Sequence, residues 1–360
     1  MITRTLLTIG VLCSSAGAVA QPADVYSQLL QLYRDEPALA AQRMAKLPEQ
    51  AISRGIRQCK EGNCSLQQLR AGAMVHADAA ALLIGPLGYA ARDQIRFGRE
   101  LLQIAANIAI NTSATERTRL ALFGGRWYGM TTRLLLAHGH FEEARLMAAE
   151  GRIRYPESPE LFVVLGLLTE WRAGLGWDAG DLRGFIVRGE LFDRAFVTSM
   201  PTRGNAARDM ETAAADYRRA IALEPSHAGA RLRLAWIHLL ADDDRVWEDV
   251  SLDFIEGASP EARFLARLLR GTAAERRSNA PSALAEYEAA RRVMPESQTG
   301  CVAVSSAQAL IGRLDEARLT AVECLRLGSG APATDAWTLF RMGLSDTTNS
   351  EGLREEATRR

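Results

Sequence analysis

The sequence predicts an all-α protein, an α-solenoid of antiparallel helix pairs stacked side by side. Three observations support this fold class. Apolar residues recur at helical spacing along most of the chain, prolines fall at intervals of 35 residues or about twice that, and the helices before two of these prolines repeat one small–aromatic–small pattern. A single helix pair cannot bury both of its faces alone, so such pairs are expected to stack.

Residues 209–241 define the repeating unit. Ala213, Tyr217 and Ala220 are spaced four and three apart, which places them on one face of a helix. Pro225 ends this helix because it has no N–H and disfavours helical geometry in the residue before it. Ser226 is the expected N-cap of a second helix, which is apolar on one face.

The landmarks of this unit recur along the chain. Pro156, Pro225, Pro260 and Pro295 are separated by 69, 35 and 35 residues. The offsets of the small and aromatic residues are repeated by Ala283, Tyr287 and Ala290, and again by Ala317, Ala321 and Cys324, while Gly271 lies where two helices are expected to meet closely. The unit before Pro260 departs from the pattern, with Trp247 in place of a small residue.

A period near 34 with this Ala–aromatic–Ala–Pro pattern resembles the tetratricopeptide repeat family, and the likeness is to its exported bacterial type. YRRAIALEP (217–225) and YEAARRVMP (287–295) are similar to typical second helices of that family. The resemblance covers residues 128–327 and implies a right-handed superhelix. We expect an N-terminal helical region at 21–125, a solenoid at 126–330 with an irregular segment at 174–208, and a C-terminal helix with a frayed tail at 331–360.

Residues 1–20 have the pattern of a secretory signal. Arg4 provides the positive start, residues 6–13 the apolar core, and Ala18–Ala20 the small-residue cleavage motif, so cleavage is expected after Ala20. Leu12 before Cys13 disfavours a lipid attachment site. No later stretch is long and apolar enough to span a bilayer. The expected location is outside the cytoplasm, in the periplasm of a Gram-negative host.

Four cysteines are left after cleavage, and an even number in an oxidising compartment predicts disulfides. Four cysteines allow three connectivities. Cys59 and Cys64 flank a tight turn, and the resemblance places Cys301 and Cys324 opposite each other on two helices of one repeat. Four buried free thiols are the alternative interpretation.

Composition and motifs argue against several classes of chemistry. Lys and Arg number 43, as do Asp and Glu, so the formal charge is zero and we expect no nucleic-acid partner. The sequence contains no P-loop and no nucleophile elbow. The five histidines are dispersed, with His76 and His238 expected as hydrogen-bonded core residues. We expect no catalytic site, no metal and no cofactor.

In the tetratricopeptide family the first helix of each pair lines the concave groove, and the resemblance implies which residues line it here. Pair by pair they are Glu160, Val163, Leu167 and Glu170, then Leu232, Trp236 and Leu239, then Leu268, Thr272 and Glu275. These residues are apolar or mildly acidic, which disfavours a clamp for a C-terminal carboxylate and favours an amphipathic or extended apolar protein segment. Trp236 is the candidate anchor, since Trp residues dominate interface energies, and a core position between repeats is the alternative.

The function expected from these features is a non-enzymatic exported scaffold that binds another protein or a peptide segment in the cell envelope. A ligand- or glycan-binding accessory subunit of an envelope complex is the alternative. It predicts an enclosed polar pocket, with Trp171 and Trp177 as its aromatic residues. An enzyme with a site scattered among the helices is the third hypothesis.

Overall fold

The described part of the chain is built of helices and contains no strand. The structure is a computed structural model that describes residues 22–84, 89–173, 206–327, 335–341, 343 and 350–358. Its elements are α1 (Pro22–Asp35), α2 (Pro37–Met44), α3 (Glu49–Gln58), η1 (Cys59–Asn63), α4 (Leu66–Leu83), α5 (Tyr89–Ala109), α6 (Ala114–Ala137), α7 (Phe141–Arg154), α8 (Pro159–Arg172), α11 (Ala206–Leu223), α12 (Ala228–Leu240), α13 (Val246–Asp249), α14 (Leu252–Gly257), α15 (Pro260–Arg276), α16 (Ala280–Val293), α17 (Gln298–Leu310), α18 (Leu314–Leu327), α19 (Ala336–Arg341) and α20 (Ser350–Thr358).

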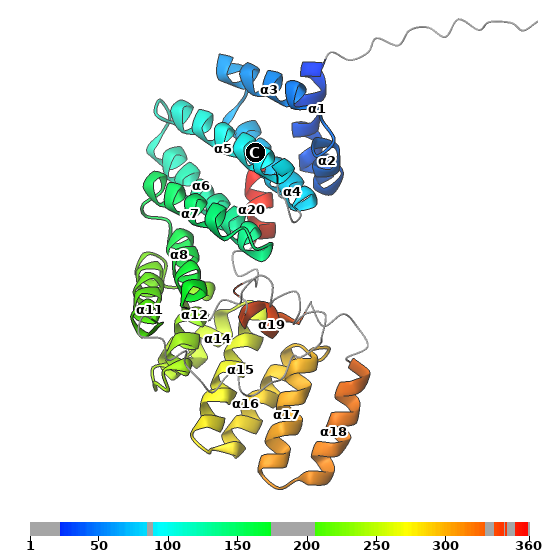
Figure 1. Cartoon of the computed structure of the whole chain (residues 1–360), viewed down its shortest axis with the longest axis vertical. Coiled ribbons are helices and arrows are strands. Elements are labelled where there is room, and N and C mark those ends of the chain that lie inside the picture. Colours follow the sequence, from blue (N-terminus) through cyan, green and yellow to red (C-terminus); the bar gives the residue numbers. More distant parts are fainter. Residues whose placement is uncertain are drawn as a thin grey trace, which may run out of the picture.

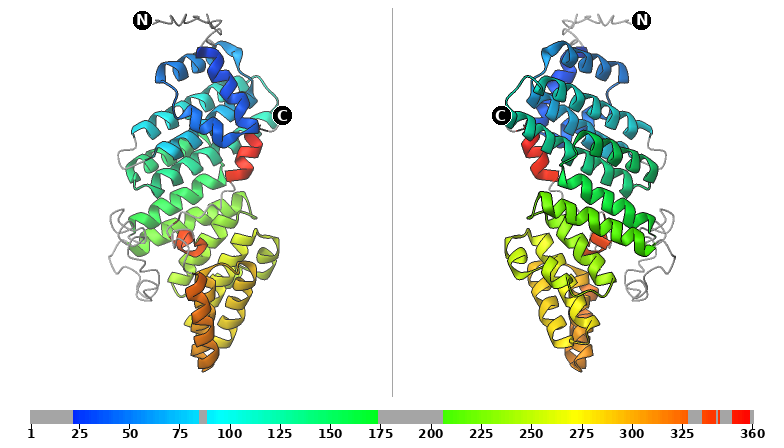
Figure 2. Two further views of the ribbon diagram at one scale, coloured as in Figure 1. Left: turned by 90° about the vertical axis from the view of Figure 1, so that its right-hand side faces the viewer. Right: turned by 90° about the vertical axis from the view of Figure 1, so that its left-hand side faces the viewer.

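Successive helices pack in pairs, and the pairs are stacked from the α1–α3 end to the α17–α18 end (Figures 1 and 2). The predicted all-α solenoid is confirmed. We call α4, α6, α8, α12, α15 and α17 the first helices, and the surface that they form together the first-helix face. The helix α6 runs from 114 to 137, so it crosses the boundary expected at 125/126.

The small–aromatic pattern of the sequence marks the closest helix contacts. A Cβ added at Gly271 would lie 2.3 Å from Cε1 of Tyr287, and one added at Gly166 would lie 2.5 Å from Cε1 of Tyr217. Both tyrosines are buried against the glycine of the preceding helix. Glycine is needed at these two positions because the ring occupies the volume of a side chain.

The irregular unit before Pro260 has two short helices in place of one long second helix. The four-residue α13 and the six-residue α14 follow α12. Trp247 is partly buried, and the guanidinium of Arg270 lies 4.6 Å from its ring centroid. The unit that departs from the repeat pattern in the sequence is therefore also irregular in the structure.

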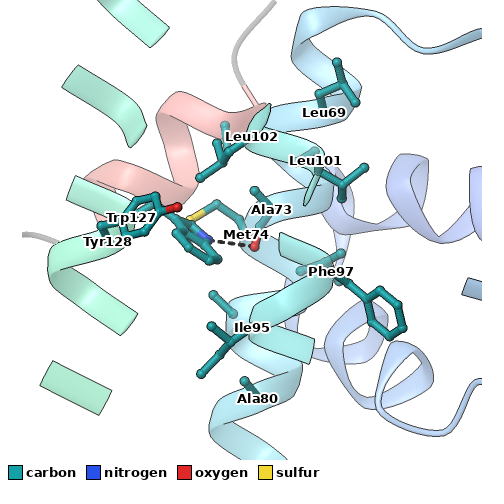
Figure 3. Packing of buried hydrophobic residues seen from close by; sticks show 14 of the residues in the cluster. Leu69, Ala73, Met74, Ala80, Ile95, Phe97, Leu101, Leu102, Trp127 and Tyr128 are labelled. Carbon is teal, nitrogen blue, oxygen red and sulfur yellow. Dashed lines mark hydrogen bonds between the residues drawn. The ribbon is translucent and has the colours of Figure 1, made fainter. Parts of the chain in front are cut away.

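The N-terminal helices share one hydrophobic core with the first repeats. Figure 3 shows Trp127 of α6 packed against α4 and α5, where its indole N–H donates to the carbonyl of Ala73 at 2.8 Å. The helices α1, α2 and α3 pack beside α4 and α5. This core supports the N-terminal end of the first-helix face.

Both expected disulfides are present. Cys59 pairs with Cys64 across 4.7 Å between Cα atoms, and Cys301 pairs with Cys324 across 5.5 Å. The second bridge joins α17 to α18. By reducing the conformational entropy of the unfolded chain, it stabilises the folded state by about 3.5 kcal/mol.

The C-terminal residues return along the solenoid. The chain reaches α18 at the far end, yet α19 lies against α15 and α20 against α4 and α6 (Figures 1 and 2). The expectation of a frayed tail is wrong for residues 350–358, because Leu353 and Ala357 of α20 are buried in the N-terminal core. Residues 1–20, residues 174–205 and Trp177 lie outside the described residues.

His76 is a hydrogen-bonded core histidine, as predicted. Its Nδ1–H donates to Oε1 of Gln94 at 2.6 Å, and its Nε2 accepts from the hydroxyl of Tyr26 at 3.2 Å. This pairing suits the neutral imidazole, since an amide oxygen can only accept. Burial lowers the pKa of His76 from 6.5 to about 4.

The buried His76 is expected to make the protein less stable at mildly acidic pH. Between pH 6.5 and pH 4 the unfolded chain binds a proton at this residue that the folded chain does not, so the free energy of unfolding falls as pH falls, by about 3 kcal/mol over the window. Urea unfolding across this range measures the slope. His76→Gln should flatten it and His138→Gln, an exposed control, should not. Equal slopes in all three proteins would contradict the assignment.

None of the helices in the described part combines the length and apolar character needed to cross a bilayer.

Candidate binding face

The first-helix face of α12 and α15 is covered by α19. The ring centroid of Trp236 lies 5.9 Å from that of Trp337 and 6.2 Å from that of Phe340, both in edge-to-face geometry. Phe340 is 0% exposed and Trp236 is 6% exposed. Trp236 is thus buried beneath a helix of its own chain.

Arg233 of α12 holds the end of α19. Its Nη1 donates to the carbonyl of Phe340 at 2.6 Å, and its guanidinium carbon lies 4.9 Å from the Phe340 ring centroid. Carbonyls in the last turn of a helix lack intrahelical partners, and this one accepts from the guanidinium and from the backbone N–H of Gly343 at 2.8 Å. Arg233 therefore contacts both the backbone and an aromatic side chain of α19.

A carboxylate of α8 neutralises this arginine. Arg233 Nε donates to Oε1 of Glu170 at 3.1 Å, and the Tyr217 hydroxyl also donates to Glu170. Burial alone would lower the pKa of Arg233, but Glu170 and Tyr217 outweigh it and the pKa is raised. The pair joins α8 to α12 and keeps a charged guanidinium on the first-helix face.

The start of α19 is fixed by Asp335. Its Oδ1 accepts from the backbone N–H of Trp337 at 3.0 Å and from the hydroxyl of Thr299 at 2.9 Å, while its Oδ2 accepts from the hydroxyl of Ser297 at 2.9 Å. These hydroxyls belong to the turn before α17 and its first residues. One carboxylate thus caps α19 and ties it to the last repeat.

Gly343 continues the C-terminal segment onto α8. Its φ of +71° lies in the left-handed region, and an added Cβ would meet Leu167 Cδ2 at 2.9 Å. Trp171 Nε1 would lie 3.4 Å from the same Cβ. The segment therefore passes close over α8 with no room for a side chain.

A second ion pair joins α6, α8 and α12. Glu160 accepts from Arg133 Nη2 at 2.8 Å and from His227 Nε2 at 3.1 Å. Burial would raise the pKa of Glu160, but Arg133 and His227 outweigh it and lower the pKa. His227 also caps α12, since its Nδ1 accepts from the N–H of Ala230 at 3.2 Å. The N-cap of α12 is therefore His227, one residue after the predicted Ser226.

Of the residues that the sequence placed in the groove, Thr272 and Glu275 are partly exposed and the others are buried. Leu232, Trp236, Leu239 and Leu268 share a cluster with Phe340, Val163 and Leu167 lie in the cluster that contains Tyr217 of α11, and Glu160 and Glu170 belong to the two ion pairs just described. Sequence reasoning missed Arg233, Asp335, Trp337 and Phe340. Trp337 and Phe340 are three residues apart, a helical spacing, and this was the available signal.

Part of the face is open beside α19. A cavity of about 610 Å³ is bordered by Trp337, Leu268, Thr272 and Glu275. The last three are groove positions implied by the resemblance. Within the described residues, no group of three or more His, Cys, Asp or Glu side chains is placed to hold a metal ion.

No family model and no curated protein matches the sequence. Among solved structures, the chain aligns with the human IFIT1 dimer with m7Gppp-AAAA at 13% identity and TM-score 0.37, over 86% of this chain and 68% of that one. An IFIT1 monomeric mutant with Gppp-AAAA aligns at 13% identity and TM-score 0.39, over 85% and 68%.

The exclusion of a nucleic-acid partner is withdrawn. The IFIT1 structures carry capped or triphosphate RNA, which is a property of those proteins. The net charge describes the whole chain, whereas nucleic-acid binding depends on the charge of one part of the surface. A net charge of zero still allows arginines to gather at one place, as Arg70, Arg119 and Arg126 do on α4 and α6.

Proposed function

We propose that the protein is a non-enzymatic binding scaffold whose first-helix face holds a short amphipathic helix of another protein. The supporting observation is the seat of α19, in which one aromatic cluster and one arginine hold a six-residue helix by its side chains and its terminal carbonyl. Such a seat can recognise any helix with the same two aromatic residues. In the free chain, α19 occupies it.

We also propose an exported, periplasmic location. The signal-like pattern of residues 1–20 and the two disulfides support it, since disulfides persist in oxidising compartments.

The test uses the full chain carrying Trp337→Ala and Phe340→Ala, with a fluorescent peptide of residues 333–343 as the probe. We expect the peptide to bind this variant with a Kd of about 1–100 μM. Binding to the unaltered chain should be at least ~10-fold weaker, because the tethered α19 competes at an effective concentration near millimolar.

Two controls give this test its specificity. Adding Trp236→Ala to the double variant should abolish binding, whereas adding Ile153→Ala, on the exposed side of α7, should leave it unchanged. Absence of binding to the folded double variant, or binding that ignores Trp236, would contradict the proposed function.

A further inference from the structure

Three arginines of the first-helix face gather beneath α20, at the other end of the face from α19. Arg70 comes from α4, and Arg119 and Arg126 are one heptad apart on α6. The carboxylate of Glu356 lies 3.8 Å from Arg119 Nε and 3.7 Å from Arg126 Nη1. Both separations exceed the 2.7–2.9 Å of a direct charged hydrogen bond, so Glu356 neutralises the arginines loosely.

Arg70 is the least satisfied member of the group. It is 4% exposed, and its Nε and Nη1 are buried with no hydrogen-bond partner within the described residues. Its Nη1 lies 3.7 Å from Glu116. Burial, and then repulsion from Arg119, lower its pKa. A buried guanidinium with open donors costs stability that a direct carboxylate contact would recover.

The opposite side of α20 is bound tightly. Arg354 donates to Asp78 from Nη2 at 2.7 Å and from Nε at 3.0 Å, and the hydroxyl of Tyr33 donates to the same carboxylate at 2.6 Å. Leu353 and Ala357 are buried. The apolar side chains and Arg354 of α20 therefore make close contacts, whereas Glu356 lies too far from the arginines of α6 to form direct hydrogen bonds.

There is space for a larger ligand beside this site. A cavity of about 660 Å³ borders Arg126 and Leu122 of α6 and reaches Glu351 of α20. Its lining also includes Glu160, Glu224 and Glu261, so a part of the ligand that extends into it would have to be neutral or basic.

We infer that Arg70, Arg119 and Arg126 form a recognition site for an acidic amphipathic helix of a partner protein, with α20 as the resident occupant in the free chain. The sequence of α20, SEGLREEAT, specifies the type of ligand, which has small or apolar residues at positions i and i+4 and a glutamate at i+3. Partner carboxylates that reach the arginines directly would satisfy the open donors of Arg70. This inference rests on the proposed function, since it assigns a second contact on the same face.

The experiment uses the full chain with Arg354→Ala, which removes the tightest polar contact of α20, and a fluorescent peptide of residues 348–358 as the probe. We expect at least ~10-fold tighter binding to this variant than to the unaltered chain, because the resident helix competes less well. Adding Arg119→Gln and Arg126→Gln should weaken binding by about 3- to 10-fold, as should Glu356→Gln in the peptide, because each ion pair is longer than a direct hydrogen bond and partly exposed.

The matched control replaces Arg92 and Arg145, on the second helices α5 and α7, by glutamine and should leave peptide affinity unchanged. Circular dichroism and thermal melting establish that each variant is folded. If affinity does not depend on Arg119 and Arg126, the acidic site is overturned. It is likewise overturned if a short single-stranded RNA binds through these arginines and the peptide does not. Binding of the 333–343 peptide is independent of these residues, so its failure concerns the proposed function and not the arginine site.

Discussion

Replacing Phe340 by alanine is expected to release α19 and to make the chain cleavable after Arg341. Phe340 is fully buried between Trp236 and Trp337, and removal of such a ring costs about 3–4 kcal/mol. If the loss acts on docking of α19 alone, its open population rises by about 10²–10³-fold. Trypsin cleavage under native conditions, followed by mass spectrometry, should show the same factor in the rate at Arg341.

The matched control is Phe141→Ala, a partly buried ring on α7 that lies away from α19. It should leave cleavage at Arg341 unchanged. An unchanged rate in the Phe340 variant would contradict the docked position of α19.

Replacing Glu170 by alanine is expected to lower the free energy of unfolding by about 3–5 kcal/mol. The change leaves Arg233 charged and 5% exposed without its carboxylate, and it also removes the acceptor of the Tyr217 hydroxyl. Urea unfolding measures the loss. The joint replacement Glu170→Met with Arg233→Met should recover most of it, because two apolar chains of similar volume leave no buried charge.

An exposed ion pair provides the comparison. Arg172 of α8 pairs with Asp209 of α11, but the Arg172 side chain is 62% exposed, so Arg172→Ala should cost less than about 1 kcal/mol. A similar small loss in the Glu170 variant would show that the buried pair does not hold α8 against α12.

The repeat architecture could be predicted from sequence because its cause is local. Tyr217 and Tyr287 need a glycine on the preceding helix, and Gly166 and Gly271 supply it at the same place in each repeat. A contact that recurs with the period of the chain is visible as a pattern. The Cys301–Cys324 bridge followed from the same register.

The state of the first-helix face could not be predicted, because it depends on contacts between distant residues. Glu160 and Glu170 were expected at a mildly acidic surface, yet each is buried against an arginine of a neighbouring first helix. Trp236 is covered by a segment about 100 residues later in the chain. Nothing in the local pattern around Trp236 indicates that occupant.

Hydrogen exchange of the full chain, followed by mass spectrometry, tests most directly whether the C-terminal segment occupies the first-helix face. We expect the amides of 338–341 to exchange at least ~100-fold more slowly than in an unstructured peptide, and Phe340→Ala to remove this protection while α16 keeps its own. Exchange of these amides at the unstructured rate in the unaltered chain would mean that the face is open, and would contradict the docked position of α19.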